Sequence, residues 1–84
     1  MRTKVYKIVM RSKDPEKIID IFKPAFECYG DVERIIIEDT GRPDIDIFWI
    51  FRTTRKNFKT INRIWNDNGW TFKKIKDIFL IKRL

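Results

Sequence analysis

The side chains that most often carry out catalysis are nearly absent from this chain of 84 residues. It contains no histidine, Ser12 is its single serine and Cys28 its single cysteine, so neither a Ser-His nor a Cys-His pair can form. Neighbouring carboxylates such as Asp44 and Asp46 could bind Mg²⁺ weakly, but their segment is rich in Asp, Gly and Pro and therefore favours a turn. We expect a protein that is not an enzyme and that holds no metal and no cofactor.

Cys28 is predicted to be a structural residue rather than a reactive thiol. It stands between Phe26 and Tyr29, and a lone cysteine among aromatic residues is typical of a small buried hydrophobic group. It has no second cysteine with which to form an internal disulfide, which favours a reducing, cytoplasmic location. The apolar runs are also far shorter than the roughly 18 residues that a membrane-spanning helix needs.

The charged side chains are sorted along the chain, and this sorting is the strongest functional signal in the sequence. Residues 1–13 hold five basic residues and no acidic one, residues 14–46 hold ten acidic and four basic residues, and residues 47–84 hold ten basic and two acidic residues. The formal net charge is +7. A basic excess predicts an anionic partner, and the sorting predicts a folded molecule with one positive and one negative side.

The pattern of apolar residues and turn formers predicts four strands and two helices. Asp14 before Pro15 is typical of a helix start, Thr53 or Thr54 can cap a second helix, and Gly30 ends the first one. The predicted elements are, in chain order, strand 3–11, helix 15–29, strand 32–38, strand 45–53, helix 55–67 and strand 77–83.

The order βαββαβ is the split βαβ pattern of the ferredoxin-like fold. Right-handed crossovers would give an α+β sandwich, with a four-stranded antiparallel sheet, both helices on one face and the last strand beside the first. We expect residues 1–84 to form one such domain. In this arrangement the basic first strand, last strand and second helix share one side of the molecule.

Alternation along the strands predicts which side chains face the helices and which lie on the open face of the sheet. The inward set is Tyr6, Ile8, Met10, Ile45, Ile47, Trp49 and Phe51. The set on the open face is Lys7, Arg11, Asp46, Phe48, Ile50 and Arg52. In the last strand Phe79 and Arg83 share one side and Ile78 and Leu80 the other, and the sequence leaves open which pair faces the helices.

This arrangement resembles the RNA-recognition motif, which has the same order of elements. The family's third strand reads K/R-G-F/Y-G/A-F-V-x-F/Y, and this chain reads Asp44-Ile45-Asp46-Ile47-Phe48-Trp49-Ile50-Phe51 at that place. Only Phe48 and Phe51 fall on aromatic positions, and Asp46 replaces a stacking aromatic residue. The resemblance implies that bases stack on the open face of the sheet while surrounding Lys and Arg side chains contact the backbone.

We therefore expect the basic side to bind RNA or another single-stranded nucleic acid, with Phe48 as the stacking residue. The predicted nucleic-acid-binding residues are Lys7, Arg11, Phe48, Arg52, Arg55, Lys56, Lys59, Arg63, Lys73, Lys74, Lys76 and Arg83.

Other interpretations stay open at this point. The chain could instead bind a protein, as an inhibitor or antitoxin-like counter-defence factor encoded by a phage or mobile element and acting on a host nuclease or ribonucleoprotein. The apolar residues Phe48, Ile50 and Phe79 could be buried in a homodimer formed through the open face of the sheet. The charge runs are also typical of solvated surfaces that keep a small protein in solution.

Overall fold

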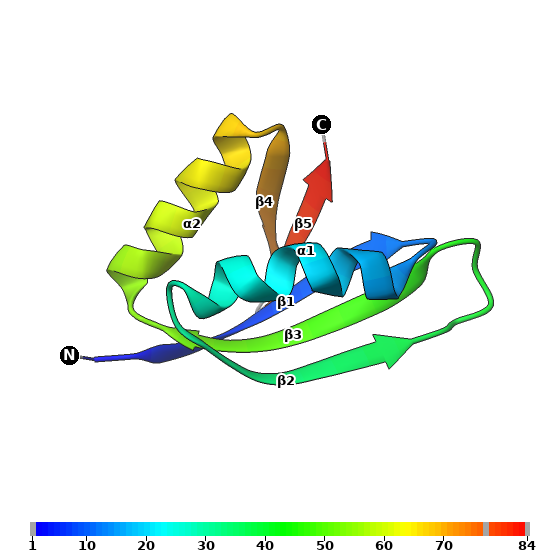
Figure 1. Cartoon of the computed structure of the whole chain (residues 1–84), viewed down its shortest axis with the longest axis horizontal. Coiled ribbons are helices and arrows are strands. Elements are labelled where there is room, and N and C mark those ends of the chain that lie inside the picture. Colours follow the sequence, from blue (N-terminus) through cyan, green and yellow to red (C-terminus); the bar gives the residue numbers. More distant parts are fainter. Residues whose placement is uncertain (1, 77, 84) are drawn as a thin grey trace.

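The computed structural model describes residues 2–76 and 78–83, and of Arg83 the backbone only. Within these residues the chain forms two helices and five strands (Figure 1). In chain order they are β1 (Lys4–Ser12), α1 (Pro15–Glu27), β2 (Asp31–Glu38), β3 (Ile45–Thr53), α2 (Arg55–Asp67), β4 (Trp70–Ile75) and β5 (Ile78–Arg83).

The strands form one mixed sheet in the order β2-β3-β1-β5-β4. β3 is antiparallel to both β1 and β2, β5 is parallel to β1, and β4 is antiparallel to β5. The α+β class is therefore as predicted, but the four-stranded antiparallel sheet is wrong. The last strand does lie beside β1, yet it runs parallel to it because the additional strand β4 reverses the chain first, so the ferredoxin-like order is not confirmed.

Both helices begin at the predicted caps. The Oδ1 atom of Asp14 accepts a hydrogen bond from the backbone N–H of Lys17 at 3.2 Å, and Pro15 is the first residue of α1. The Oγ1 atom of Thr54 accepts one from the backbone N–H of Asn57 at 3.1 Å. These two caps fix where each helix leaves the end of a strand.

One hydrophobic cluster lies between the sheet and the two helices. It contains Phe22 and Phe26 of α1, Phe58 and Ile61 of α2, and Ile81 of β5. Because both helices contribute to the same cluster, both lie on one face of the sheet, as predicted. The strand residues in the cluster are Tyr6, Ile8, Met10, Ile47, Trp49 and Phe51, all from the predicted inward set.

The β4–β5 hairpin stands at a steep angle to β1, β2 and β3 (Figure 1). β5 pairs with β1 over only three positions, from Lys7 opposite Ile78 to Val9 opposite Leu80. Among the described residues no strand pairs with residues 4–6 of β1 on that side, which leaves a gap between the start of β1, the hairpin and α2.

Gly30 links α1 to β2 where the backbone passes very close to β3. A Cβ atom at this position would lie 2.4 Å from the carbonyl oxygen of Arg52 and 2.8 Å from the Cβ atom of Thr53. The hydroxyl of Thr53 donates a 2.6 Å hydrogen bond to the carbonyl of Tyr29, which holds the two segments together. This position thus needs glycine because of close approach, beyond the role in ending a helix that the sequence suggested.

We expect Gly30→Ala to lower the free energy of unfolding by about 3 kcal/mol, the upper end for overpacking, because the backbone of β3 must shift. Gly41→Ala is the matched control, since nothing lies within 4 Å of its Cβ position. Its positive φ of 79° should still cost about 1 kcal/mol. Urea denaturation of the two variants measures the difference, and equal losses would contradict the role given to Gly30.

Candidate nucleic-acid interface

A basic groove lies in the gap between the first residues of β1, the β4–β5 hairpin and α2. It consists of two adjoining pockets of about 280 and about 520 Å³ that share Lys4, Tyr6 and Phe79 in their walls. Its lining residues are Lys4, Val5, Tyr6, Lys7, Arg55, Phe58, Lys59, Asn62, Lys74, Lys76 and Phe79. More than half of them are basic and none is acidic. The groove follows from the short pairing of β5 with β1, because a longer β5 would fill it.

Aromatic rings form the floor of the basic groove. The rings of Tyr6 and Phe58 are stacked with their centroids 3.9 Å apart, and Phe79 meets both rings edge-on at 5.8 and 4.8 Å. Tyr6 and Phe58 are each 6% exposed, whereas Phe79 is half-buried. The floor is therefore rigid, and most of its aromatic surface is already covered by other rings.

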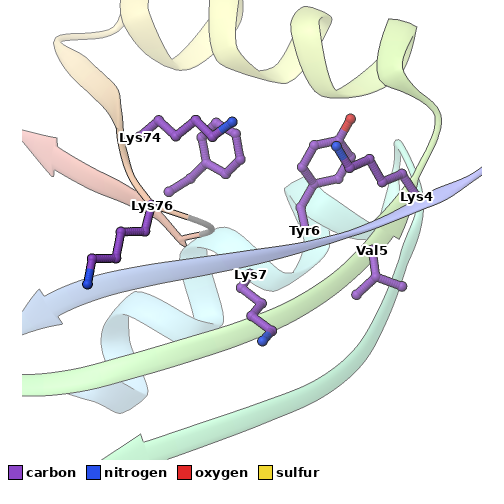
Figure 2. Close-up of a pocket in the computed structure, with 7 residues that line it drawn as sticks. Lys4, Val5, Tyr6, Lys7, Lys74 and Lys76 are labelled. Carbon is purple, nitrogen blue, oxygen red and sulfur yellow. The ribbon is translucent and has the colours of Figure 1, made fainter.

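The lysines reach the basic groove from different strands. Figure 2 shows Lys4 and Tyr6 directed to the same side of β1, whereas Lys7 and Val5 point to the opposite side. Lys74 extends from β4 toward the side on which Tyr6 lies (Figure 2). The ammonium group of Lys4 lies 5.5 Å from the centre of the Tyr6 ring, a cation–π distance. Lys4 and Lys74 thus flank the aromatic floor from two elements that are far apart in the sequence.

Five basic residues of the groove have no ion-pair partner among the described residues. None of Lys4, Arg55, Lys59, Lys74 and Lys76 forms an ion pair with another residue of the described part of the chain. Unpaired cations that line one concave surface add their potentials and attract anions from solution. An anion in the groove would meet several ammonium or guanidinium groups at once.

Two basic residues of the open face, Arg11 and Arg52, form ion pairs with acidic side chains. The Nε atom of Arg11 lies 3.0 Å from Oδ1 of Asp46, and Nη2 of Arg42 lies 3.7 Å from Oδ2 of the same carboxylate. Arg52 is paired with Glu33 of the neighbouring strand. Acidic side chains therefore neutralise Arg11 and Arg52, two of the residues that the sequence predicted to contact phosphate.

Phe48 lies on the open face, as predicted, but within an apolar row. It is in register with Ile36 of β2 and Val9 of β1, and Val9 is in register with Leu80 of β5. Val9 and Leu80 are each 7% exposed and Phe48 is half-buried, so neighbouring side chains cover much of the row. Phe79, whose face the sequence left open, faces the helices and belongs to the floor of the basic groove, so it is not available to the homodimer through the open face that was the alternative.

The structure brings together part of the predicted binding set. The members that line the basic groove are Lys7, Arg55, Lys59, Lys74 and Lys76. The members that do not are Arg11, Phe48, Arg52, Lys56, Arg63 and Lys73. The side chain of Arg83 lies outside the described residues.

Lys4, Tyr6 and Phe79 line the basic groove but were not among the predicted binding residues. Alternation could have indicated the first pair, because Lys4 and Tyr6 share one side of β1 and Tyr6 was placed on the helix face. Phe79 could not be assigned in this way, because its face depends on how β5 pairs with β1.

Three further sequence expectations concern single sites and membrane insertion. Cys28 is exposed rather than buried, because it follows the last turn of α1 and points away from the core. In residues 2–76 and 78–83 no three His, Cys, Asp or Glu side chains are grouped as a metal site would require. In the same part of the chain neither helix has the length and apolar character to cross a membrane.

Comparison of the chain with protein-family models, with curated proteins and with solved structures gives no match.

Proposed function

We propose that this chain is a binding protein without catalytic activity that holds single-stranded nucleic acid, RNA in particular, by its phosphate backbone in the basic groove. The observation that carries the proposal is the groove itself, in which the described lining residues include six basic and no acidic side chains, next to an aromatic floor. The sorted charges supply its electrostatics, since β1, α2 and the β4–β5 hairpin come from the two basic parts of the sequence.

Backbone binding fits the lysines better than base recognition does. An ammonium group is a compact charge that contacts a phosphate without reading a base, and most of the cations here are lysines. The rings of Tyr6 and Phe58 are stacked on each other, so Phe79 is left as the aromatic residue that a base could touch. We therefore expect weak base preference and strong dependence of the affinity on salt.

A single strand is the favoured form of the nucleic acid. A flexible strand can follow a concave surface between a helix and a hairpin, as in other single-strand-binding grooves. A duplex is stiffer and wider, and proteins read it mainly through contacts across its outer grooves.

The experiment that tests the proposal is fluorescence anisotropy with a labelled single-stranded RNA, repeated from low to physiological salt. Neutralisation of four to six phosphates should give a log-log salt slope of about −3 to −4, since single strands contribute roughly −0.7 per phosphate. An absence of binding at low salt would contradict the proposal and would point to a protein partner for the basic side.

Two neighbouring lysines in β4 provide a matched pair of variants. Lys74 is in register with Phe79 and lines the basic groove, whereas Lys73 is in register with Leu80 and points to the open face. We expect Lys74→Ala to weaken RNA binding about fivefold, the loss of one charge contact of roughly 1 kcal/mol. Lys73→Ala removes the same charge and should change the affinity less than twofold. Equal losses in the two variants would mean that total charge, not the groove, determines binding.

A further inference from the structure

The outer edge of β2 has no partner strand among the described residues. β2 is the first strand of the sheet order, so only its inner edge is hydrogen bonded, to β3. An open edge presents a row of backbone N–H and C=O groups that can pair with a strand of another chain. The register with β3 is interrupted between Val32 and Arg34, and from Arg34 to Glu38 it is regular. The regular segment is the part of the edge that could accept a further strand.

This segment is unusually apolar for an exposed edge. It contains three consecutive isoleucines, of which Ile36 is 38% exposed and Ile37 is 51% exposed. Ile36 lies on the open face, opposite Phe48, and Ile37 lies on the helix face, opposite Ile47. The edge therefore offers apolar side chains on both faces of the sheet, together with its free backbone groups.

The opposite charges at the two ends of this segment are complementary to those of a second copy that pairs with it in the antiparallel direction. If two copies pair antiparallel about a two-fold axis at Ile36, then Arg34 of one copy lies opposite Glu38 of the other. In this register Ile36 faces its own counterpart and Ile35 faces Ile37, so every apolar residue meets an apolar residue. Neither Arg34 nor Glu38 forms an ion pair with another described residue of its own chain.

We propose that β2 is a homodimer interface, at which a second copy of this chain pairs edge to edge through residues 34–38. The two-fold axis is perpendicular to the sheet, so the two sheets join into one continuous sheet and all helices lie on the same face. The strand order becomes β4-β5-β1-β3-β2 followed by the same order reversed. This interface differs from the dimer through the open face that the sequence suggested.

The dimer leaves both basic grooves free. Each groove is formed by β1, α2 and the β4–β5 hairpin, toward the edge of the sheet that is opposite to β2. A long strand of nucleic acid could then engage two grooves at once and gain avidity, whereas a short one would fill a single groove. The proposal does not depend on nucleic-acid binding, because the edge and its charges stand apart from the groove.

The test is sedimentation equilibrium of the full chain and of charge-reversed variants. A small interface of this kind should have a Kd on the order of 10–100 µM. Arg34→Glu places like charges opposite each other in the dimer, and so does Glu38→Arg. We expect each single variant to dimerise at least tenfold more weakly, the double variant to dimerise as the original chain does, and an equal mixture of the two single variants to form a heterodimer.

Two substitutions by lysine distinguish a dimer through the β2 edge from a dimer through another surface. Ile37→Lys changes the helix face of the edge and should abolish the dimer, whereas Ile75→Lys is the matched control on the opposite edge strand, where Ile75 is 48% exposed. The proposal is overturned if the original chain stays monomeric well above the expected Kd. It is overturned equally if the single charge variants dimerise unchanged or if their mixture fails to form the heterodimer.

Discussion

Replacement of Lys4, Lys59 and Lys74 by alanine is expected to lower the affinity for single-stranded RNA by about 100-fold at low salt. The three lysines come from β1, α2 and β4, so together they remove charge from every wall of the basic groove. Each contact between an ammonium group and a phosphate contributes roughly 1 kcal/mol in a solvent-exposed site, and three such losses give the expected factor. The log-log salt slope should also become less steep by about 2, because three fewer phosphates are neutralised.

The control for this triple variant removes the same amount of charge elsewhere. Lys13, Lys17 and Lys23 are exposed and belong to the α1 side of the molecule. Their combined replacement by alanine should change the affinity by less than about threefold, through the weaker long-range field alone. If both triple variants lose the same affinity, RNA responds to net charge and the groove has no special role.

Phe26→Ala is expected to have the largest effect on stability. Phe26 is fully buried, and its ring centroid lies 5.0 Å from those of both Trp49 and Phe51. Loss of a buried Phe side chain usually costs about 3–5 kcal/mol. A domain of this length has roughly 4–13 kcal/mol of stability in total, so the loss would be a large fraction of it. Urea denaturation followed by the fluorescence of the three tryptophans, of which Trp49 is fully buried, measures the loss.

Phe48→Ala is the control variant both for the stability measurement and for the RNA-binding measurement. Phe48 is half-buried in the open-face row, so its removal should cost about 1–2 kcal/mol. Its side chain is not part of the groove, and RNA affinity should stay within about twofold of the original. A loss of stability for Phe48→Ala as large as that for Phe26→Ala would contradict the placement of the core on the helix face. A large loss of RNA affinity would favour stacking on the open face.

Local signals in the sequence predicted most of the first two thirds of the fold. The Asp14–Pro15 pair and Thr54 mark the helix starts through side chains that cap the next turn. The alternation in β1 and β3 placed Tyr6 and Trp49 on the helix face, because one apolar side of each strand has to be buried. Such features depend on neighbours in the sequence and can be recognised without knowledge of the tertiary structure.

The β4–β5 hairpin was not predicted, for an equally local reason. Its connection contains Lys76 at a φ of 56° where a hairpin commonly has Gly or Asn, so no turn signal separates the two strands. β4 also carries two lysines, Lys73 and Lys74, which interrupt its short apolar alternation after Trp70 and Phe72. Tertiary contacts stabilise this hairpin, among them the packing of Phe72 against Phe58 of α2 and of Trp70 against Phe22 of α1.

The sequence predicted that the candidate site is basic, but it did not predict that the site lies in the groove rather than on the open face of the sheet. The sorting of the charges indicated that β1, α2 and the end of the chain share a basic side. It could not indicate that Asp46 lies beside Arg11, because that contact depends on the register between β1 and β3. Arg11 and Arg52 of the open face are paired with acidic side chains, whereas Lys4, Lys59 and Lys74 at the groove form no ion pair with another described residue.

The most direct test of this account is an NMR titration of the ¹⁵N-labelled chain with a short single-stranded RNA. We expect amide shifts to concentrate at Lys4, Tyr6, Lys59, Lys74 and Phe79, in the walls and floor of the basic groove. Shifts concentrated instead at Phe48, Ile50 and Arg52, with the groove residues unchanged, would place the binding surface on the open face of the sheet and overturn the assignment of the groove.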